Sequence, residues 1–362
     1  MVRRQSDSVD QADWNNLACF LERRGLRFLS LRFLRSLRLF SFSFAPWRLC
    51  VSFCSPWRLG VRFLPVILRA KQRQIAFPRR PLVMGIVNLN DDSFSGDGTL
   101  DINEGIRHAR KLISEGADIV DVGGESARTN RPEIPEQQEI DRVAPFIVRF
   151  QECWEGLSPV DAIQVFPPLL SVNTWRSPVA NSLLSLGGDL LNDVGALATD
   201  ENARIAARHH AALLIMHSIG LPKQKHTDVQ YMEIMRTLEQ FFEEKLAVAK
   251  KAGLPREFVV IDPGLDFAKQ RHHNLTILRE LRRLARFDRP ILLPVSRKTV
   301  IGEVLGLPNP ADRDPGTMAG VVAGIRSNAS IFRVHNVRAT SLVVRMVWKI
   351  LGEEDRNRSH AK

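Results

Sequence analysis

The chain has 362 residues, of which 44% are hydrophobic and 25% charged, enough for one large barrel domain or two ordinary ones. Its net charge of +11 would suit a nucleic-acid partner, but residues 1–74 hold fourteen basic and four acidic residues, whereas residues 75–362 hold 37 and 36. The body is therefore electrically balanced, and we expect no nucleic-acid partner. We also expect no membrane span, because no uninterrupted apolar run approaches ~20 residues.

Residues 1–77 are expected to form a basic, low-complexity extension without a stable domain. Residues 23–74 contain no acidic residue, and "APWRLCVSF" at 45–53 is followed by a near-repeat at 55–63. A targeting presequence and an amphipathic surface-binding segment share this composition, and the favoured interpretation is a non-functional extension or a misassigned start site. Three of the four cysteines lie here, and only Cys153 lies in the body. We therefore expect no disulfide framework and a cytoplasmic location.

Between residues 78 and 352, short apolar runs alternate with helical patterns. The runs are 82–88, 117–124, 169–174, 189–193, 212–218, 258–264, 290–296 and 330–336. Near-continuous apolar strands alternating with helices indicate a parallel sheet buried on both faces. Eight such units in one segment predict an α/β fold, a (β/α)8 TIM barrel, followed by a polar C-terminal tail at 353–362.

Each apolar run ends in polar residues on its C-terminal side. In chain order these are Asn88, Asp121 with Glu125, Asn173, Asn192 with Asp193, His217, Asp262, Ser296 to Lys298, and Arg333 with His335. In a barrel these strand ends meet at one mouth, where active sites are built. Arg333 and His335 lie two residues apart on a strand, so both side chains face the same side.

The motifs at these strand ends resemble those of dihydropteroate synthase, in the pterin-binding barrel family. They are "MGIVNLNDDSFSGDG" (84–98), "GADIVDVGGESAR" (116–128), "VIDPGLDFAK" (260–269), "SRKTVIG" (296–302) and "FRVHNV" (332–337). The resemblance implies a transferase that joins 6-hydroxymethyl-dihydropterin diphosphate to p-aminobenzoate with loss of pyrophosphate. It also implies Mg²⁺ as cofactor and a homodimer.

The same resemblance implies a role for each matching residue. The diphosphate and its Mg²⁺ are assigned to Asn88, which contacts the metal, and to Arg128, Arg333 and His335. The pterin is assigned to Asn192, Asp262, Lys298, Phe267 and Met216. The p-aminobenzoate is assigned to Phe94, Ser296 and Thr299, with its carboxylate near the N-terminus of the helix that Thr299 opens. The catalytic set is Asn173, Asp262, Lys298, Arg333 and His335.

Two of these assignments have structural alternatives. Arg333 could pair with a structural carboxylate instead of a diphosphate, and Asp262, which precedes Pro-Gly, could cap a turn. A carboxylate at Asp262 would otherwise accept two adjacent N–H groups of the pterin.

The chain departs from the family pattern near the expected chemistry. Asn173 stands where the family has Asp, Ala127 replaces a hydroxyl residue, and Asp266 stands where the family has Gly. Losing the Asn173 charge would weaken an electrostatic partner of the pterin cation. Two further functions therefore stay open: a related transferase with an altered pterin or arylamine, and a non-catalytic pterin-binding barrel. A pterin-dependent methyltransferase fits less well, because it would not use the diphosphate and benzoate motifs.

Overall fold

The computed structural model describes residues 65–91, 98–127, 132–220, 222–224 and 229–360, and its centre is an eight-stranded parallel sheet. The strand order is β8-β7-β6-β5-β4-β3-β10-β9, and a parallel bridge between Ile261 and Ile291 joins the two ends. The strands are β3 (Leu82–Asn88), β4 (Ile119–Gly123), β5 (Leu169–Asn173), β6 (Leu190–Asp193), β7 (Ala212–Met216), β8 (Val259–Asp262), β9 (Leu292–Leu293) and β10 (Ile331–Val334). The predicted (β/α)8 barrel is confirmed.

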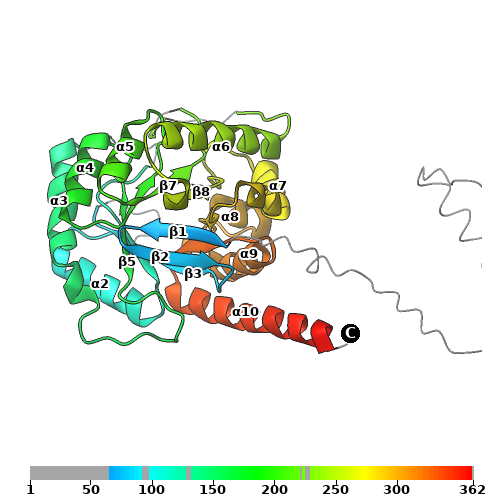
Figure 1. Cartoon of the computed structure of the whole chain (residues 1–362). Coiled ribbons are helices and arrows are strands. Elements are labelled where there is room, and N and C mark those ends of the chain that lie inside the picture. The colour runs from blue at the N-terminus through cyan, green and yellow to red at the C-terminus, as the bar shows by residue number, and fades with distance from the viewer. Residues whose placement is uncertain (1–64, 92–97, 128–131, 221, 225–228, 361–362) are drawn as a thin grey trace, which may run out of the picture. The chain divides into compact units, whose positions relative to one another are not determined.

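Helices follow the strands and cover the outside of the barrel, as Figure 1 shows for α3, α4 and α5 along one flank. The α-helices are α2 (Ile102–Ser114), α3 (Glu136–Val148), α4 (Ser177–Leu186), α5 (Glu201–Arg208), α6 (Ile234–Lys251), α7 (Arg271–Glu280), α8 (Thr299–Leu305), α9 (Asp314–Arg326) and α10 (Val337–His360). Short 3-10 helices are η2 (Phe150–Cys153), η3 (Arg256–Phe258), η4 (Leu281–Phe287) and η5 (Pro310–Arg313).

The strands alternate between two apolar layers because successive side chains point to opposite faces. Val83 and Val87 of β3 belong to the larger layer, which also contains buried side chains of the surrounding helices. Leu82 and Met84 belong to a smaller layer inside the barrel. Continuing the inner face by two residues at a time leads to the polar residues at the strand ends. The apolar alternation thus places the candidate site residues inside the barrel mouth.

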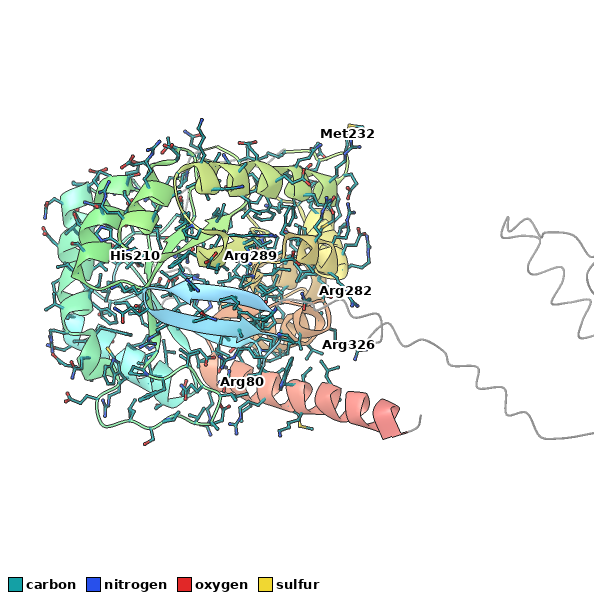
Figure 2. All side chains as sticks on the ribbon, in the orientation of Figure 1. Arg80, His210, Met232, Arg282, Arg289 and Arg326 are labelled. Atoms are coloured by element: carbon teal, nitrogen blue, oxygen red, sulfur yellow. The ribbon has the colours of Figure 1, made fainter. Side chains whose placement is uncertain are left out.

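A β-hairpin packs on the inner layer from the amino end of the barrel. Its strands are β1 (Val66–Ala70) and β2 (Arg73–Phe77), which pair antiparallel. The backbone N–H of Lys71 donates to the carbonyl of His210 at 2.6 Å, and Arg289 donates to the carbonyl of Ile67 at 3.3 Å. His210 and Arg289 lie beside the hairpin in Figure 2.

The hairpin shows that packed structure begins before the boundary expected at residue 78. Leu68 and Ala70 of β1, with Ile75 and Phe77 of β2, are buried in the inner layer. Their short apolar alternation was hidden in the sequence by the Arg- and Leu-rich segment that precedes it. The unit Met1–Arg62 lies outside the described residues, so the nature of the extension stays a prediction.

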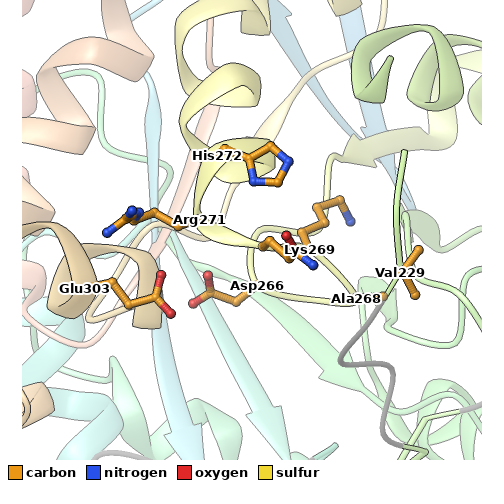
Figure 3. A pocket seen from close by; sticks show the side chains of 8 residues that line it. Val229, Asp266, Ala268, Lys269, Arg271, His272 and Glu303 are labelled. Carbon is orange, nitrogen blue, oxygen red and sulfur yellow. The ribbon is translucent and has the colours of Figure 1, made fainter. Parts of the chain in front are cut away.

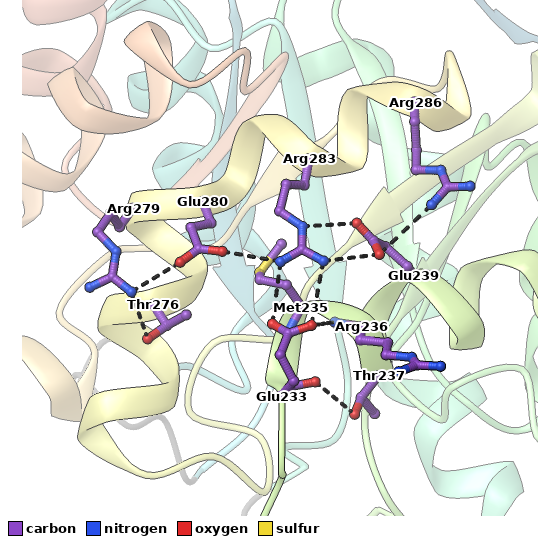
Figure 4. Close-up of polar contacts among 10 residues, drawn as sticks. All are labelled: Glu233, Met235, Arg236, Thr237, Glu239, Thr276, Arg279, Glu280, Arg283 and Arg286. Carbon is purple, nitrogen blue, oxygen red and sulfur yellow. Dashed lines mark hydrogen bonds and ion pairs between the residues drawn. The ribbon is translucent and has the colours of Figure 1, made fainter. Parts of the chain in front are cut away.

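An ion-pair cluster joins the start of α6 to η4 (Figure 4). Arg283 donates to Glu239 at 3.0 Å and to Glu280 at 3.1 Å, and it also contacts Glu233 at 3.3 Å. Glu233 is the N-cap of α6, where its side chain accepts hydrogen bonds from two backbone N–H groups. Because the cluster lies at the surface, we assign it to local anchoring rather than to the site.

Helix α10 runs from Val337 to His360 and extends into the range expected as a polar tail. Figure 1 shows it leading away from the barrel toward the C-terminus. Among the helices that the structure describes, α10 included, none is both long and apolar enough to cross a membrane.

The hairpin should contribute measurably to stability. Leu68 is fully buried in the inner layer, so Leu68→Ala should lower the free energy of unfolding by about 2–5 kcal/mol through lost burial and a residual cavity. The exposed Gln74 of the same hairpin is a matched control, and Gln74→Ala should change it by less than about 0.5 kcal/mol. Urea unfolding followed by circular dichroism measures both. Equal effects would show that the hairpin does not support the barrel.

Candidate functional site

Polar side chains from six strands face the interior of the barrel at its carboxyl end. The same two-residue alternation that places Ile119, Leu169, Leu190, Val260 and Ile331 in the inner layer leads to the residues one or two steps further along each strand. These are Asn88 on β3, Asp121 on β4, Ser171 and Asn173 on β5, Asn192 on β6, Asp262 on β8, and Arg333 on β10.

Asp121 is the centre of this group. Its carboxylate is fully buried and accepts hydrogen bonds from Ser171 Oγ at 2.5 Å, Asn173 Nδ2 at 3.2 Å, Asn192 Nδ2 at 3.1 Å and Arg333 Nε at 2.7 Å. A buried charge is tolerated when it is paired and fully hydrogen-bonded, and this one meets both conditions. The sequence identified Asp121 as a strand-end residue but gave it no role.

Arg333 bears on both interpretations that the sequence left open, and the structure shows one of them. Its Nε is paired with Asp121, so it does serve a structural carboxylate. Its terminal guanidinium nitrogens make no hydrogen bond to any residue that the structure describes, and 23% of the side chain is exposed. A guanidinium held at Nε presents its other donors in a fixed direction, as an anion site requires.

Asn173 uses its amide as a donor. Since Nδ2 points to Asp121 Oδ2, the carbonyl oxygen of Asn173 is left as an acceptor. The same holds for Asn192, whose Nδ2 lies within hydrogen-bonding distance of both Asp121 oxygens. Asn173 therefore fits its neighbour as an amide, in a place where an aspartate would face a second carboxylate.

Asp262 ends β8 and is almost fully buried. Its Oδ1 accepts the backbone N–H of Gly264 at 2.7 Å, so the expected turn contact exists. Its Oδ2 makes no hydrogen bond within the described part of the chain. Burial raises the pKa of Asp262 to about 6, opposed by the positive charges of Lys298, Lys269 and Arg333. At neutral pH the Asp262 carboxylate is therefore mostly ionised and can accept hydrogen bonds.

Flat and apolar groups lie around Asp262. Met216 pairs with Asp262 in the register of β7 and β8, and it is buried. The Lys298 ammonium lies 4.8 Å from the centre of the Phe267 ring. Burial lowers the pKa of Lys298, and the carboxylates of Asp266 and Asp262 oppose that shift. The structure thus brings together four of the five residues assigned to the pterin, with Asn192 one strand beyond β7.

The loop that carries Phe267 is anchored by Lys269 and His217. Lys269 Nζ lies 2.9 Å from His217 Nδ1 and donates to the carbonyl of Phe267 at 2.9 Å. Burial lowers the pKa of His217 to about 2 and that of Lys269 to about 7. His217 is therefore neutral and accepts at Nδ1. Neither residue was predicted to have a role, although His217 lies at a predicted strand end.

His335 and Ser296, assigned to different substrates, are direct neighbours. Ser296 Oγ lies 2.9 Å from His335 Nδ1 and accepts the backbone N–H of His335 at 3.2 Å. Thr299 begins α8, as expected, and its backbone N–H donates to Asp266 Oδ2 at 2.5 Å. Arg128 and Phe94 lie outside the described residues, so their roles stay predictions.

An ion cluster ties together three loops at the same end of the barrel. Arg176, after β5, pairs with Glu125 at 2.8 Å and Glu139 at 3.2 Å, and Lys223, after β7, pairs with Glu125 at 2.7 Å. Burial raises the pKa of Glu139 to about 7. No role could be predicted for Arg176 and Lys223 from sequence, because their partners come from distant segments.

The described part of the chain offers few side-chain ligands for a metal ion. No group of three or more His, Cys, Asp or Glu side chains there is arranged to hold an ion. Asn88, the predicted magnesium contact, ends β3 on the inner face. One amide oxygen at the mouth fits a hard cation that takes most of its remaining ligands from substrate phosphates and water.

Replacing Asn173 by aspartate should destabilise the fold, because the neighbouring Asp121 carboxylate requires a hydrogen-bond donor at position 173. In the Asn173→Asp variant two carboxylates would lie side by side, and their repulsion would raise the pKa of the pair in the folded state above its value in the unfolded chain. Asn173→Asp should therefore lower the free energy of unfolding by about 1–3 kcal/mol at pH 8. The cost should shrink as the pH falls toward 5, because protonation of the pair relieves the repulsion. Asn173→Ala, whose cost should not vary with pH, is the control. A fully stable Asn173→Asp variant at pH 8 would contradict this account of the cluster.

The family model described as "Pterin binding enzyme" matches residues 84–335. A dihydropteroate synthase of Neisseria meningitidis serogroup C is 34% identical over 278 residues, covering 75% of this chain and 93% of that protein. The mitochondrial folate synthesis bifunctional protein of Arabidopsis thaliana is 37% identical over 275 residues. That match covers 72% of this chain, which spans 48% of the longer plant protein.

Solved structures give the same grouping. A Yersinia pestis dihydropteroate synthase in a sulfonamide drug complex has a TM-score of 0.71 at 31% identity, covering 79% of this chain and 99% of that chain. A Thermus thermophilus dihydropteroate synthase in complex with 4-aminobenzoate has a TM-score of 0.66 at 31% identity, with the same coverage. The chain belongs to the pterin-binding enzyme family, alongside the dihydropteroate synthases.

Proposed function

We propose that the chain is a dihydropteroate synthase, which condenses 6-hydroxymethyl-7,8-dihydropterin diphosphate with p-aminobenzoate and releases pyrophosphate. The observation that carries the proposal is the convergence of Asp262, Lys298 and Arg333 at one mouth of the barrel. A carboxylate with an open oxygen, a cation above an aromatic ring and a guanidinium with open donors are the groups that a pterin diphosphate would need.

The pterin would be held by its polar edge. Asp262 would accept the two adjacent N–H groups of the ring, which gives sharp discrimination because a missing donor leaves a buried charge unpaired. Asn173 and Asn192 would add carbonyl acceptors, since their Nδ2 groups are committed to Asp121. Met216, Phe267 and Lys298 would contact the faces of the ring. Binding would then tolerate an amide at position 173.

The diphosphate would be held at the other side of the mouth. The terminal nitrogens of Arg333 and the ring of His335 would face it, with Asn88 beside them. Bound Mg²⁺ would neutralise charge on the diphosphate, with Asn88 as its protein ligand. Arg128 would add a further cation.

In the reaction, the carbon–oxygen bond between the pterin methylene and the diphosphate breaks, and pyrophosphate leaves with the bonding electrons. The nitrogen of the arylamine forms a bond to the methylene carbon and loses one proton. Arg333 and His335 would stabilise the departing charge, and Asp262 would hold the pterin in line. No nucleophilic side chain of the protein is required.

Pyrophosphate release tests the proposal. The full chain should be used, because the hairpin β1–β2 packs against the inner layer at the amino end of the barrel and a fragment that begins after β1 would lose this packing. The chain, Mg²⁺ and the pterin diphosphate should release pyrophosphate in proportion to added p-aminobenzoate, and Arg333→Ala should reduce kcat by about 100-fold or more. Calorimetric pterin binding without release would instead identify a non-catalytic binding protein. Release with a different arylamine only would identify a related transferase.

Pterin binding should depend on the ionisation of Asp262. Its pKa is raised to about 6, so the carboxylate loses an acceptor oxygen to protonation below that pH. Pterin affinity should be constant from pH 7 to 8 and fall about tenfold per unit below pH 6. Calorimetry from pH 5 to 8 measures this. Asp262→Asn should bind weakly at every pH, and a flat profile for the unmodified chain would refute the assignment of Asp262.

We further propose that the protein acts as a homodimer in the cytoplasm. The free, buried Cys153, which is the one cysteine of residues 75–362, supports a reducing compartment. Sedimentation of the purified chain would measure the oligomeric state.

A further inference from the structure

The side chain of Lys269 joins the loop between β8 and α7 to the end of β7. Its ammonium donates to the carbonyl of Phe267 at 2.9 Å and to the carbonyl of His217 at 3.2 Å, and it lies 2.9 Å from His217 Nδ1. An ammonium has three N–H donors, and three acceptors surround this one. Lys269 therefore holds the backbone of Phe267 at a fixed place beside His217.

His217 connects this anchor with the strand end that carries Asp262. The backbone N–H of His217 donates to the carbonyl of Asp262 at 2.9 Å. The start of the loop lies against the same residue, because a Cβ added at Gly264 would stand 2.0 Å from the carbonyl oxygen of His217. The residue that accepts from Lys269 is thus bonded directly to the residue proposed to bind the pterin edge.

The loop needs such an anchor because its own backbone and packing support it poorly. Ala268 has a φ of +52°, in the left-handed region that a residue with a Cβ adopts at a steric cost. The loop also lines a cavity of about 600 Å³, so packed side chains do not fill that side of it. Figure 3 shows the Lys269 side chain pointing away from the carboxylates of Asp266 and Glu303. Its contacts with His217 and Phe267 are therefore the ones that support the loop.

Two other side chains hold neighbouring residues of the loop. Tyr231 Oη donates to the carbonyl of Ala268 at 3.0 Å, and Asn274 Nδ2 donates to Asp266 Oδ1 at 3.0 Å. Lys269 holds the residue between these two, and that residue carries the aromatic ring.

We propose that Lys269 is a positioning residue of the pterin site, which fixes the Phe267 ring, and with it the Lys298 ammonium, relative to Asp262. The Lys298 ammonium lies 4.8 Å from the centre of the Phe267 ring, so a shift of the ring removes the surface beside which this cation lies. The inference rests on the proposed function, because it concerns the residues that would hold the pterin of that reaction. Lys269 acts through its neighbours and does not itself contact the substrate.

The charge of Lys269 has a second consequence at Asp262. Burial raises the pKa of Asp262 to about 6, and the positive charges of Lys298, Lys269 and Arg333 oppose this rise. Removing one of these charges should raise the pKa of Asp262 further, so the pH below which pterin affinity falls should move upward by about 0.5 unit or more. The titratable groups that face Lys269 or Asp262 are Lys298, Arg333, Asp266, His217 and His273.

Calorimetric binding of 6-hydroxymethylpterin to the full chain tests the proposal without the diphosphate. At pH 6.5, Lys269→Met keeps most of the side chain and removes its donors and its charge, so it should weaken binding about tenfold. It should also move the acid limit of binding upward. Lys269→Arg keeps the charge, but its planar fork does not fit three acceptors that converge on one atom. This variant should weaken binding and leave the acid limit in place, a difference that a loss of general stability would not produce.

A matched control and the folded state of each variant complete the test. Lys250→Met removes an exposed lysine from the last turn of α6 and should change neither the affinity nor the acid limit. Thermal unfolding shows which variants are folded, and Lys269→Arg decides alone if Lys269→Met does not fold. A folded Lys269 variant that binds the pterin as tightly as the unmodified chain would overturn the inference, whereas amine-dependent release of pyrophosphate would leave the proposed function standing. An unmodified chain that binds no pterin would overturn both.

Discussion

The candidate site depends on the hydrogen bonds and the ion pair that the buried carboxylate of Asp121 accepts. It lies on β4 and accepts hydrogen bonds from β5, β6 and β10, so one group fixes polar side chains of three other strands. Because the Asp121 carboxylate accepts hydrogen bonds, the amide nitrogens of Asn173 and Asn192 point toward it and their carbonyl oxygens point away from it. It also holds Arg333 by Nε, while the terminal nitrogens make no hydrogen bond within the described part of the chain. The buried Asp121 thus sets the orientation of the polar side chains at the barrel mouth.

The barrel, and the side chains gathered at its mouth, could be predicted from sequence because both follow from short-range patterns. Apolar runs of strand length reveal the strands, and the convergence of their carboxyl ends brings Asp262, Lys298 and Arg333 together. The contacts of Asp121 could not be read in this way. Its partners lie 50 to 212 positions away along the chain, and only the closed barrel brings them within reach.

Other features escaped prediction for local reasons. The hairpin strands β1 and β2 are short, and they follow a segment whose composition dominates any window that includes them. The contact between Asp266 and α8 depends on the left-handed backbone conformation of Asp266. This conformation could not be predicted from sequence, because residues other than glycine adopt it only occasionally. The Arg176 cluster combines three loops that are separated by other elements.

The two ends of the site differ in how closely they follow the family pattern. At the carboxyl ends of the strands Asp262 is retained, and the amide of Asn173 donates a hydrogen bond to the carboxylate of Asp121. In the loop between β8 and α7 a carboxylate stands at Asp266, where the family has glycine, and it accepts the backbone N–H of Thr299, which opens α8.

The most direct measurement is a crystal structure of the full chain with a pterin diphosphate bound. The account predicts the polar edge of the ring within hydrogen-bonding distance of both oxygens of Asp262, with its face against Lys298. The diphosphate should contact the terminal nitrogens of Arg333 while Nε stays on Asp121. A pterin bound away from Asp262, or a diphosphate that displaces Arg333 from Asp121, would contradict it.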